Sequence, residues 1–266
     1  MRCTIVSLLC LVCSCFSIGF GEVRQRVLIT DKISKRIFTK VEGMFQANGI
    51  DVVTKPGYSA SDLKRVLAEY DGVLIRSATK LTKEVIGKKS NLRCIGRAGV
   101  GLDNICMQTC NELDIRVFNS PLGNCQATSE LTVGLMMCLS RQIHKAHTST
   151  VDGRFQDRAM YVGMELKGKT LGIVGMGNIG RNVCSICRAM GMKVITNSAS
   201  SSDSDLQTLG AERVNFEELL RRSDVLTVHV PLLDSTWGLI DSTAFAQMKP
   251  SALLVNTARG TSTPKS

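Results

Sequence analysis

Short apolar runs alternate along this chain with longer stretches in which apolar residues recur every three or four positions. The runs predict buried strands, and the longer stretches predict amphipathic helices that cover them. In the first half the predicted strands cover residues 27–30, 52–53, 72–76, 92–96 and 116–119, and helices are predicted over 34–48 and 61–70. Regular alternation of strand and helix favours a parallel, doubly wound sheet.

A second alternation begins at residue 170, after a long apolar helix predicted over residues 128–147. Its strands are predicted at 170–174, 193–196, 225–230 and 252–256. We therefore expect an α/β fold with two doubly wound parallel-sheet domains. The first, over residues 24–120, is expected to be flavodoxin-like, and the second, over residues 121–266, is expected to be of the Rossmann type.

A glycine motif follows the first strand of the second alternation and opens a predicted helix over residues 181–190. Its three glycines are Gly175, Gly177 and Gly180. The first permits a tight turn, the second lets the backbone approach a pyrophosphate, and the third lets the helix pack closely on the strand. The free N–H groups at the helix start favour the two phosphates. Together these features predict a dinucleotide site.

The next strand ends at Asn197 and Ser198, where such folds usually carry an acid that binds the adenosine ribose. No acid stands there. The nearest ones, Asp203 and Asp205, lie in a serine-rich run over residues 198–205 that predicts a flexible loop. Because no arginine lies between residues 193 and 205 to pair with a 2′-phosphate, NAD is the preferred cofactor. We expect it to bind more weakly than the glycine motif alone would suggest.

The composition of the 266-residue chain is that of a globular protein, with 44% hydrophobic and 21% charged residues. Its net charge of +10 comes from scattered lysines and arginines, and only 5% of the residues are aromatic. This distribution disfavours nucleic acid as a partner. A cofactor with two phosphates and a phosphorylated acid substrate would suit the charge just as well.

Four of the 11 cysteines lie in the first 21 residues, and the others are spread through predicted strands and helices. This spread favours reduced core thiols over a disulfide framework. Cys184 and Cys187 form a C-x-x-C pair inside the helix after the glycine motif, and the sequence offers no second ligand pair beside them. We predict that they pack in the core and that the protein has no metal site.

The first 23 residues form a hydrophobic leader. They carry one positive charge, an apolar run and small residues near the end, which is the outline of a secretory signal peptide. The apolar run is too short for a comfortable membrane span. The leader therefore indicates secretion, whereas the reduced thiols indicate a reducing compartment.

From residue 26 to residue 260 the sequence resembles the D-isomer-specific 2-hydroxyacid dehydrogenases. The resemblance is carried by residues 73–80 (VLIRSATK), 95–104 (IGRAGVGLDN), 166–172 (LKGKTLG), 228–232 (VHVPL) and 255–260 (VNTARG). It implies a substrate domain followed by an NAD-binding domain, and NAD-dependent oxidation of the 2-hydroxyl group of 3-phosphoglycerate. It also implies a cytoplasmic location, with secretion as the alternative that the leader raises.

The resemblance assigns roles to individual residues. Arg259 matches the arginine that binds the substrate carboxylate in this family. Arg76 and Ser77 match substrate-side positions, and Arg97 is a further candidate anion contact. Besides the three glycines, the residues expected around the cofactor are Asn178, Ile179, Ser198, Val100, Val230, Thr257 and Ala258.

In this family a histidine takes the hydroxyl proton and a glutamate holds that histidine, on strands after the segment that residues 255–260 match. Because the sequence ends at Ser266, we expect an incomplete NAD-binding domain and impaired catalysis. His229 lies on a predicted buried strand and is expected to be a neutral, packed imidazole. Two alternatives stay open. One is a hydroxypyruvate or glyoxylate reductase, and the other is a non-catalytic NAD-binding module. For every one of these readings, the resemblance implies a homo-oligomer that pairs through helix 128–147.

Overall fold

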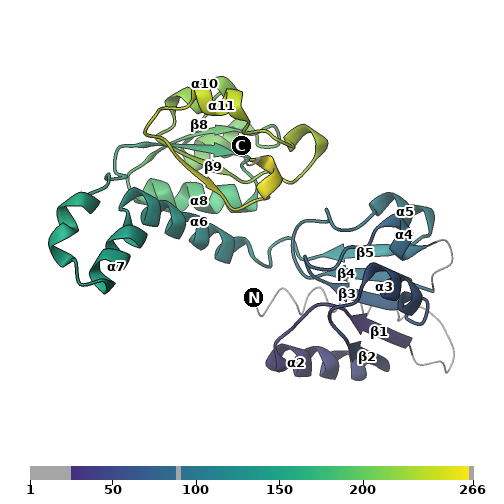
Figure 1. Cartoon of the computed structure of the whole chain (residues 1–266). Coiled ribbons are helices and arrows are strands. Elements are labelled where there is room, and N and C mark those ends of the chain that lie inside the picture. The colour runs from purple at the N-terminus through teal and green to yellow at the C-terminus, as the bar shows by residue number, and fades with distance from the viewer. Residues whose placement is uncertain (1–24, 88–90, 264–266) are drawn as a thin grey trace. The chain divides into compact units, whose positions relative to one another are not determined.

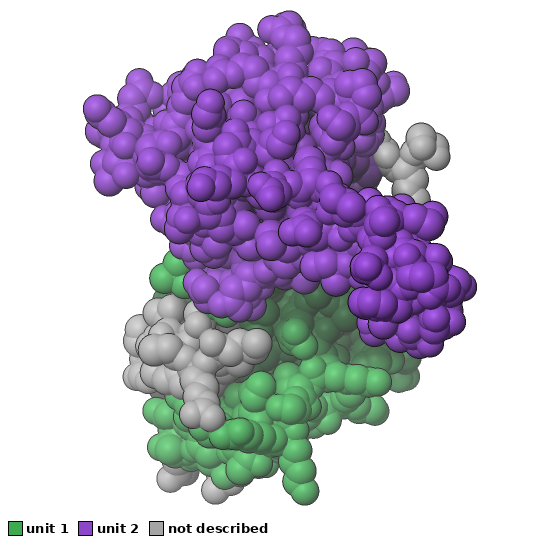
Figure 2. All heavy atoms as spheres, turned by 90° about the vertical axis from the view of Figure 1, so that its left-hand side faces the viewer, with its two compact units in different colours: residues 1–124 green, residues 125–266 purple. Residues whose placement is uncertain are grey.

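The computed structural model describes residues 25–87 and 91–263, and the chain divides into two compact units, residues 1–124 and 125–266 (Figure 2). The predicted leader lies outside the described residues. None of the helices in the described part of the chain is long and apolar enough to cross a membrane.

Unit 1 is built on a parallel five-stranded sheet with the strand order β2-β1-β3-β4-β5 (Figure 1). The strands are β1 (Gln25–Ile29), β2 (Ile50–Thr54), β3 (Gly72–Ile75), β4 (Cys94–Arg97) and β5 (Arg116–Asn119). The helices are α2 (Lys35–Gln46), α3 (Ala60–Leu67), α4 (Lys83–Ile86) and α5 (Met107–Glu112). This is the flavodoxin-like order, in which the winding reverses between β1 and β3.

Successive residues of β1 face opposite sides of this sheet, as the two-residue period of a strand requires. Leu28 belongs to a core cluster that contains Leu63 of α3 and Cys110 of α5. Val27 belongs to the opposite cluster, which contains Phe45 of α2. Because helices cover both faces, a continuous apolar run forms the strand.

Unit 2 carries a second parallel five-stranded sheet, in the order β10-β9-β6-β7-β8. The strands are β6 (Thr170–Val174), β7 (Lys193–Asn197), β8 (Ala211–Arg213), β9 (Val225–Val228) and β10 (Leu253–Asn256). The α-helices are α6 (Cys125–Ser140), α7 (Ile143–Val151), α8 (Asn178–Ala189), α9 (Asp203–Leu209), α10 (Phe216–Arg222) and α11 (Ser242–Gln247). Three short 3₁₀ turns are η1 (Phe155–Tyr161), η2 (Asp234–Thr236) and η3 (Gly260–Ser262).

Helices cover both faces of the second sheet as well. On one face, Met136 of α6 and Val183 of α8 share a core cluster with Leu171 of β6. On the other face, Leu219 of α10 shares a cluster with Val174 of β6. Counted from β6, the strand order is 5-4-1-2-3, which matches the first five strands of the Rossmann fold. The predicted α/β fold with two doubly wound parallel sheets is therefore confirmed.

The helix predicted over residues 128–147 is wrong in one respect, because the structure breaks it into α6 and α7. Gln142, between the two helices, has a φ of +51°, which is left-handed backbone. The Ser140 carbonyl, which a continuous helix would pair with residue 144, instead accepts the Met164 N–H at 2.8 Å. The returning chain at residue 164 therefore takes the carbonyl that the helix needs in order to continue.

The flexible loop predicted over residues 198–205 is also wrong, because its last residues begin α9. The Ser202 hydroxyl caps this helix by accepting the Asp205 N–H at 3.2 Å. Asp203 and Asp205 occupy the first turn, where carboxylates stabilise the positive end of the helix dipole. Ser198 and Ser201, earlier in the run, are buried.

Candidate functional site

The predicted cofactor residues of unit 2 lie at the carboxyl ends of four strands of one parallel sheet. The ends of parallel strands meet at the same sheet edge, where open α/β folds bind ligands. After β6, β7, β9 and β10 come, in order, the glycine motif with Asn178 and Ile179, then Ser198, then Val230, and finally Thr257, Ala258 and Arg259. The fold therefore brings the nine predicted cofactor residues of unit 2, together with Arg259, to one edge.

The three glycines of the motif differ in what a side chain would meet at their positions. Gly175 has a φ of +89°, and a Cβ there would stand 2.7 Å from the Val230 side chain. A Cβ on Gly180 would stand 2.3 Å from the Gly175 carbonyl oxygen. At Gly177, by contrast, a Cβ would meet no atom within 4 Å. The first and third glycines thus let the chain pack, whereas the second leaves open space beside the backbone.

The open backbone at Gly177 caps the amino end of α8, a helix of 12 residues. Its free N–H groups and dipole favour an anionic group there. A side chain at Gly177 would fill the open space at this helix start, so the residues present fit the pyrophosphate of a dinucleotide.

The end of β7 lies directly against the glycine turn. The Ser198 hydroxyl accepts the Met176 N–H at 3.3 Å, and the Ser201 hydroxyl donates to the Met176 carbonyl at 3.3 Å. The Ser198 hydroxyl, at the strand end where related folds place an acid, is thus held beside the turn. Its role at the adenosine ribose stays a prediction.

Arg213, which the sequence reasoning did not select, also reaches this edge from β8. Its guanidinium donates to the Ser198 and Ser201 carbonyls and, at 2.7 Å, to the Asp203 carboxylate. Local sequence gave no signal for it, because its partners lie ten or more residues away and the three-residue strand that carries it has little apolar pattern. The pairing of β7 with β8 brings it to the loop.

The loop after β10 presents Thr257, Ala258 and Arg259. The Thr257 hydroxyl lies 2.8 Å from that of Thr132 on α6, and the Ala258 N–H donates to the Asn256 side chain at 2.9 Å. The Arg259 carbonyl accepts from the same amide at 2.9 Å. Asn256 therefore fixes the turn that presents Arg259, whose planar guanidinium suits a carboxylate.

His229 lies between β9 and Val230, with its Nε2 atom 3.0 Å from the Thr227 hydroxyl. Burial lowers the pKa of the imidazole to about 4. The ring is therefore neutral at pH 7 and is a weak base, which agrees with the packed role expected from the sequence.

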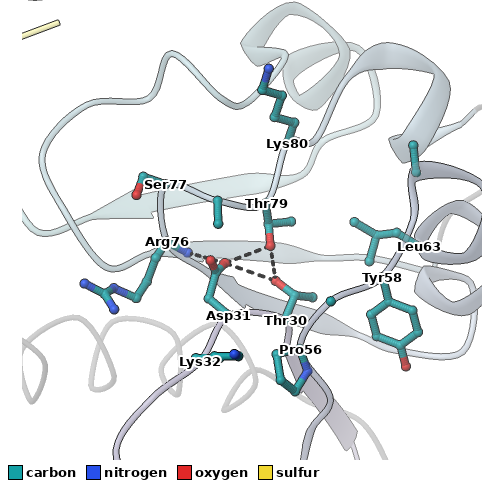
Figure 3. A pocket seen from close by; sticks show the side chains of 13 residues that line it. Thr30, Asp31, Lys32, Pro56, Tyr58, Leu63, Arg76, Ser77, Thr79 and Lys80 are labelled. Atoms are coloured by element: carbon teal, nitrogen blue, oxygen red, sulfur yellow. Dashed lines mark hydrogen bonds between the residues drawn. The ribbon is translucent and has the colours of Figure 1, made fainter.

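Unit 1 carries a second candidate site, a cavity of about 570 Å³ at the carboxyl ends of β1, β2 and β3. The buried Asp31 carboxylate organises it by accepting the Arg76 N–H at 2.8 Å and the Thr79 hydroxyl at 2.7 Å (Figure 3). The Asn104 amide donates to the carbonyls of Arg76 and Thr79 at 2.8 and 2.6 Å. The loop after β3 is thus held by its backbone, and the Arg76 side chain extends away from Asp31 (Figure 3).

Arg76 and Ser77, both predicted from the sequence, line this cavity, together with Lys32 and Lys80, which were not selected. Arg97 is absent from the lining, since it is 6% exposed and its guanidinium packs over Gly99, within 1.7 Å of where a Cβ would stand. The carbonyl of Val100, also in unit 1, accepts a hydrogen bond from the Asn119 side-chain amide at 2.7 Å. The predicted cofactor role of Val100 stays a prediction.

Cys184 and Cys187 are fully buried in the core cluster of α6, α8 and β6. Burial raises the pKa of Cys187 to about 12 and also raises that of Cys184. Both thiols are therefore protonated packing groups at pH 7.

The open space at Gly177 predicts that Gly177→Ala will separate cofactor binding from folding. Because the new methyl meets no protein atom, the free energy of unfolding should stay within about 1 kcal/mol of wild type. NADH affinity should fall about tenfold or more, since the methyl occupies the space of the pyrophosphate. Urea denaturation and nicotinamide fluorescence measure the two quantities. Gly180→Ala is the matched control, expected to cost about 1–3 kcal/mol of stability through overpacking. Unchanged NADH affinity in Gly177→Ala would contradict the placement.

Burial of neutral His229 predicts a loss of stability in acid. The unfolded chain takes up a proton near pH 6.5 and the folded one only near pH 4, so unfolding becomes easier as the pH falls between these values. The contribution is about 3 kcal/mol at pH 4 relative to pH 7. Urea unfolding of His229→Gln from pH 7 to pH 4 should show a shallower decline than wild type. His147→Gln, which removes an exposed histidine of α7, must leave the wild-type decline in place. Equal slopes for wild type and His229→Gln would refute the assignment.

Comparison with known proteins agrees with this geometry. Residues 133–265 match the family described as "D-isomer specific 2-hydroxyacid dehydrogenase, NAD binding domain". D-3-phosphoglycerate dehydrogenase of Rattus norvegicus is 39% identical over 242 residues, which cover 91% of this chain and 44% of that protein. A hydroxypyruvate reductase of Thermotoga maritima is 39% identical over 237 residues, covering 89% of this chain and 75% of that protein. The chain spans about half the length of the phosphoglycerate dehydrogenases that it matches.

Among solved structures, D-lactate dehydrogenase of Aquifex aeolicus, complexed with NAD and lactic acid, superposes with a TM-score of 0.80 at 26% identity. The match covers 89% of this chain and 70% of that one. The resemblance expected from the sequence and the predicted NAD-binding domain are thereby confirmed. The chain belongs to the family of D-isomer-specific 2-hydroxyacid dehydrogenases, and its second unit carries the NAD-binding domain of that family.

Proposed function

We propose that this chain binds NAD at the carboxyl edge of the unit 2 sheet and serves in NAD-dependent oxidation of 3-phosphoglycerate to 3-phosphohydroxypyruvate. The observation that carries the proposal is the glycine turn, with its open backbone at Gly177 and with Arg259 at the same sheet edge. The identity to phosphoglycerate dehydrogenases over 91% of this chain supports the substrate.

In this proposal the planar guanidinium of Arg259, at the unit 2 sheet edge, suits a carboxylate group. Arg76, Lys80 and Ser77, around the unit 1 cavity, bind the phosphate, because exposed cations on an ordered loop attract a doubly charged anion. Asp31 and Asn104 position that loop without touching the substrate. NAD, when bound, supplies the acceptor for the hydride. His229 is not assigned the hydroxyl proton, because its half-buried imidazole is weakly basic.

A second substrate class deserves a direct comparison, since the hydroxypyruvate reductase of Thermotoga maritima is equally similar in identity. The cations Lys32, Arg76 and Lys80 favour the phosphorylated substrate, because an unphosphorylated 2-hydroxy acid carries only one charge to neutralise. Calorimetry with glycerate and hydroxypyruvate in place of 3-phosphoglycerate distinguishes the two classes.

Removing one of these cations tests the substrate. With NAD in excess, Arg76→Gln should weaken 3-phosphoglycerate binding about tenfold or more, the worth of one hydrogen bond to a charged group. Binding of NAD alone should not change. Calorimetry measures both affinities, and NADH absorbance measures turnover. Arg36→Gln, which removes an exposed arginine of α2, is the charge-matched control. Equal affinity for glycerate and 3-phosphoglycerate in wild type would overturn the phosphorylated substrate, and no NAD binding would overturn the proposal as a whole.

A dimerising NAD-binding module is a second candidate, favoured by an apolar stripe along α6 and the start of α7. Leu131, Leu135 and Leu139 are spaced four residues apart on one face of α6, and Ile143 is the first residue of α7. These four side chains are 38–56% exposed. A row of large exposed apolar side chains is typical of an interaction surface. A second copy of this chain is the partner that we propose for it.

This surface predicts that one charged substitution will dissociate the pair. Light scattering after gel filtration should report a dimer for wild type and a monomer for Leu135→Glu. Because Leu135 is 39% exposed within the chain, the substitution should leave the circular dichroism spectrum unchanged. Leu233→Glu, at an exposed apolar residue before η2, is the matched control and should remain dimeric. A monomeric wild type at micromolar concentration would exclude the module.

A further inference from the structure

The ribose end of the cofactor site is unusual in its charge. In an NAD site of this fold, the strand next to the glycine turn ends in a carboxylate that binds the ribose hydroxyls and repels a 2′-phosphate. Here β7 ends at Asn197, and Ser198 follows with a neutral hydroxyl that contacts the Met176 N–H. The repelling charge is therefore replaced by a small hydrogen-bonding group.

A guanidinium stands at the same loop. Arg213 donates from Nη1 to the Ser198 carbonyl and from Nη2 to the Ser201 carbonyl, and its Nε donates to the Asp203 carboxylate at 2.7 Å. These bonds use three of the five N–H groups of the guanidinium. Its side chain is 38% exposed, so its remaining two N–H groups can meet a ligand.

The guanidinium binds the carbonyls of Ser198 and Ser201, whereas the hydroxyls of the two serines contact the glycine turn. These hydroxyls stand 3.3 Å from each other, and both contact Met176 between the first two glycines of the motif. The Ser201 hydroxyl already donates its hydrogen to the Met176 carbonyl, so the guanidinium of Arg213 is the donor that suits a phosphate. It is bonded to the loop after β7, and an arginine near this strand end accommodates the 2′-phosphate of NADP in this fold.

From this arrangement we propose that the ribose subsite of unit 2 accepts a 2′-phosphate, so that the chain binds NADP(H) at least as tightly as NAD(H). Arg213 and Ser198 are the specificity-determining residues. The inference rests on the proposed binding of a dinucleotide at the glycine turn, and it names which dinucleotides that turn admits.

Two carboxylates also lie near the subsite and oppose a phosphate. Asp203 pairs with Arg213, and Asp205 pairs with Arg181 of α8 at 2.9 Å. The Asp203 side chain is 87% exposed and Asp205 is 48% exposed, so water screens both. Each is matched by its own arginine, and the four charges sum to zero. An acid at position 198 would make that sum negative.

Titration of the full chain with NADPH and with NADH, followed by nicotinamide fluorescence at fixed ionic strength, tests the inference. We expect the Kd for NADPH to equal that for NADH or to lie below it. Ser198→Asp should raise the ratio of the NADPH to the NADH Kd about tenfold or more, by adding the ribose-binding acid and removing the site for the phosphate. Arg213→Gln should weaken NADPH binding and leave NADH binding within about twofold of wild type.

Arg222→Gln is the matched control, because Arg222 belongs to the same unit and pairs with two glutamates, Glu212 and Glu218. It removes the same charge and should leave the ratio unchanged. Circular dichroism shows whether each variant keeps its fold. A wild-type Kd for NADPH more than tenfold above that for NADH overturns the inference and leaves the proposed function standing. Binding of neither dinucleotide overturns the proposed function and the inference with it.

Discussion

The contact between Gly180 and the Gly175 carbonyl determines the geometry of unit 2. A methyl group at residue 180 would stand 2.3 Å from that oxygen, so α8 lies as close to the end of β6 as the backbone allows. The turn between them therefore projects Met176 and Gly177 at the sheet edge. Ser198 and Ser201 contact Met176, and Val230 packs on Gly175. The ends of β7 and β9 are thus fixed against one turn.

In unit 1 a carboxylate, rather than a glycine contact, fixes a loop at the sheet edge. Both units carry a parallel sheet, so both gather loops at the carboxyl edge. In unit 1 the buried Asp31 accepts the Arg76 N–H and the Thr79 hydroxyl, which fixes the loop through its backbone. A buried charge is stable only when it is hydrogen-bonded in this way. Because Asp31 is occupied by the loop, the Arg76 guanidinium remains available at the edge.

The strands and the glycine turn could be predicted because their signals are local. An apolar run such as that of β6 and three glycines at fixed spacing require no knowledge of distant residues. The break at Gln142 could not be predicted, since neither glycine nor proline marks it and the cause is the Met164 N–H on the Ser140 carbonyl. Gly163 makes that approach feasible, because a Cβ there would stand 2.2 Å from the same carbonyl oxygen.

Asp31 and Arg213 also could not be predicted, because their contacts lie far away along the chain. Asp31 acts on residues 45 and 48 positions away, and Arg213 acts on a loop that reaches it only through strand pairing. The start of α9, in contrast, had a local signal, a serine three residues before an aspartate, which is a common helix cap. The serine-rich composition of the run concealed it. Local patterns thus located the sheet edges, whereas the side chains that define their chemistry depended on tertiary contacts.

Part of the net charge of +10 lies around the unit 1 cavity. In unit 2 several arginines near the sheet are matched by acids, as in the pairs of Arg181 with Asp205 and Arg222 with Glu212. Around the unit 1 cavity, Lys32, Arg76 and Lys80 line the wall, and within the described residues no ion pair involves them. An exposed cation costs little desolvation, so these charges are tolerated without an acid. A bound anion with two charges would neutralise the excess at that edge, which is the electrostatic reason to expect a phosphorylated acid there.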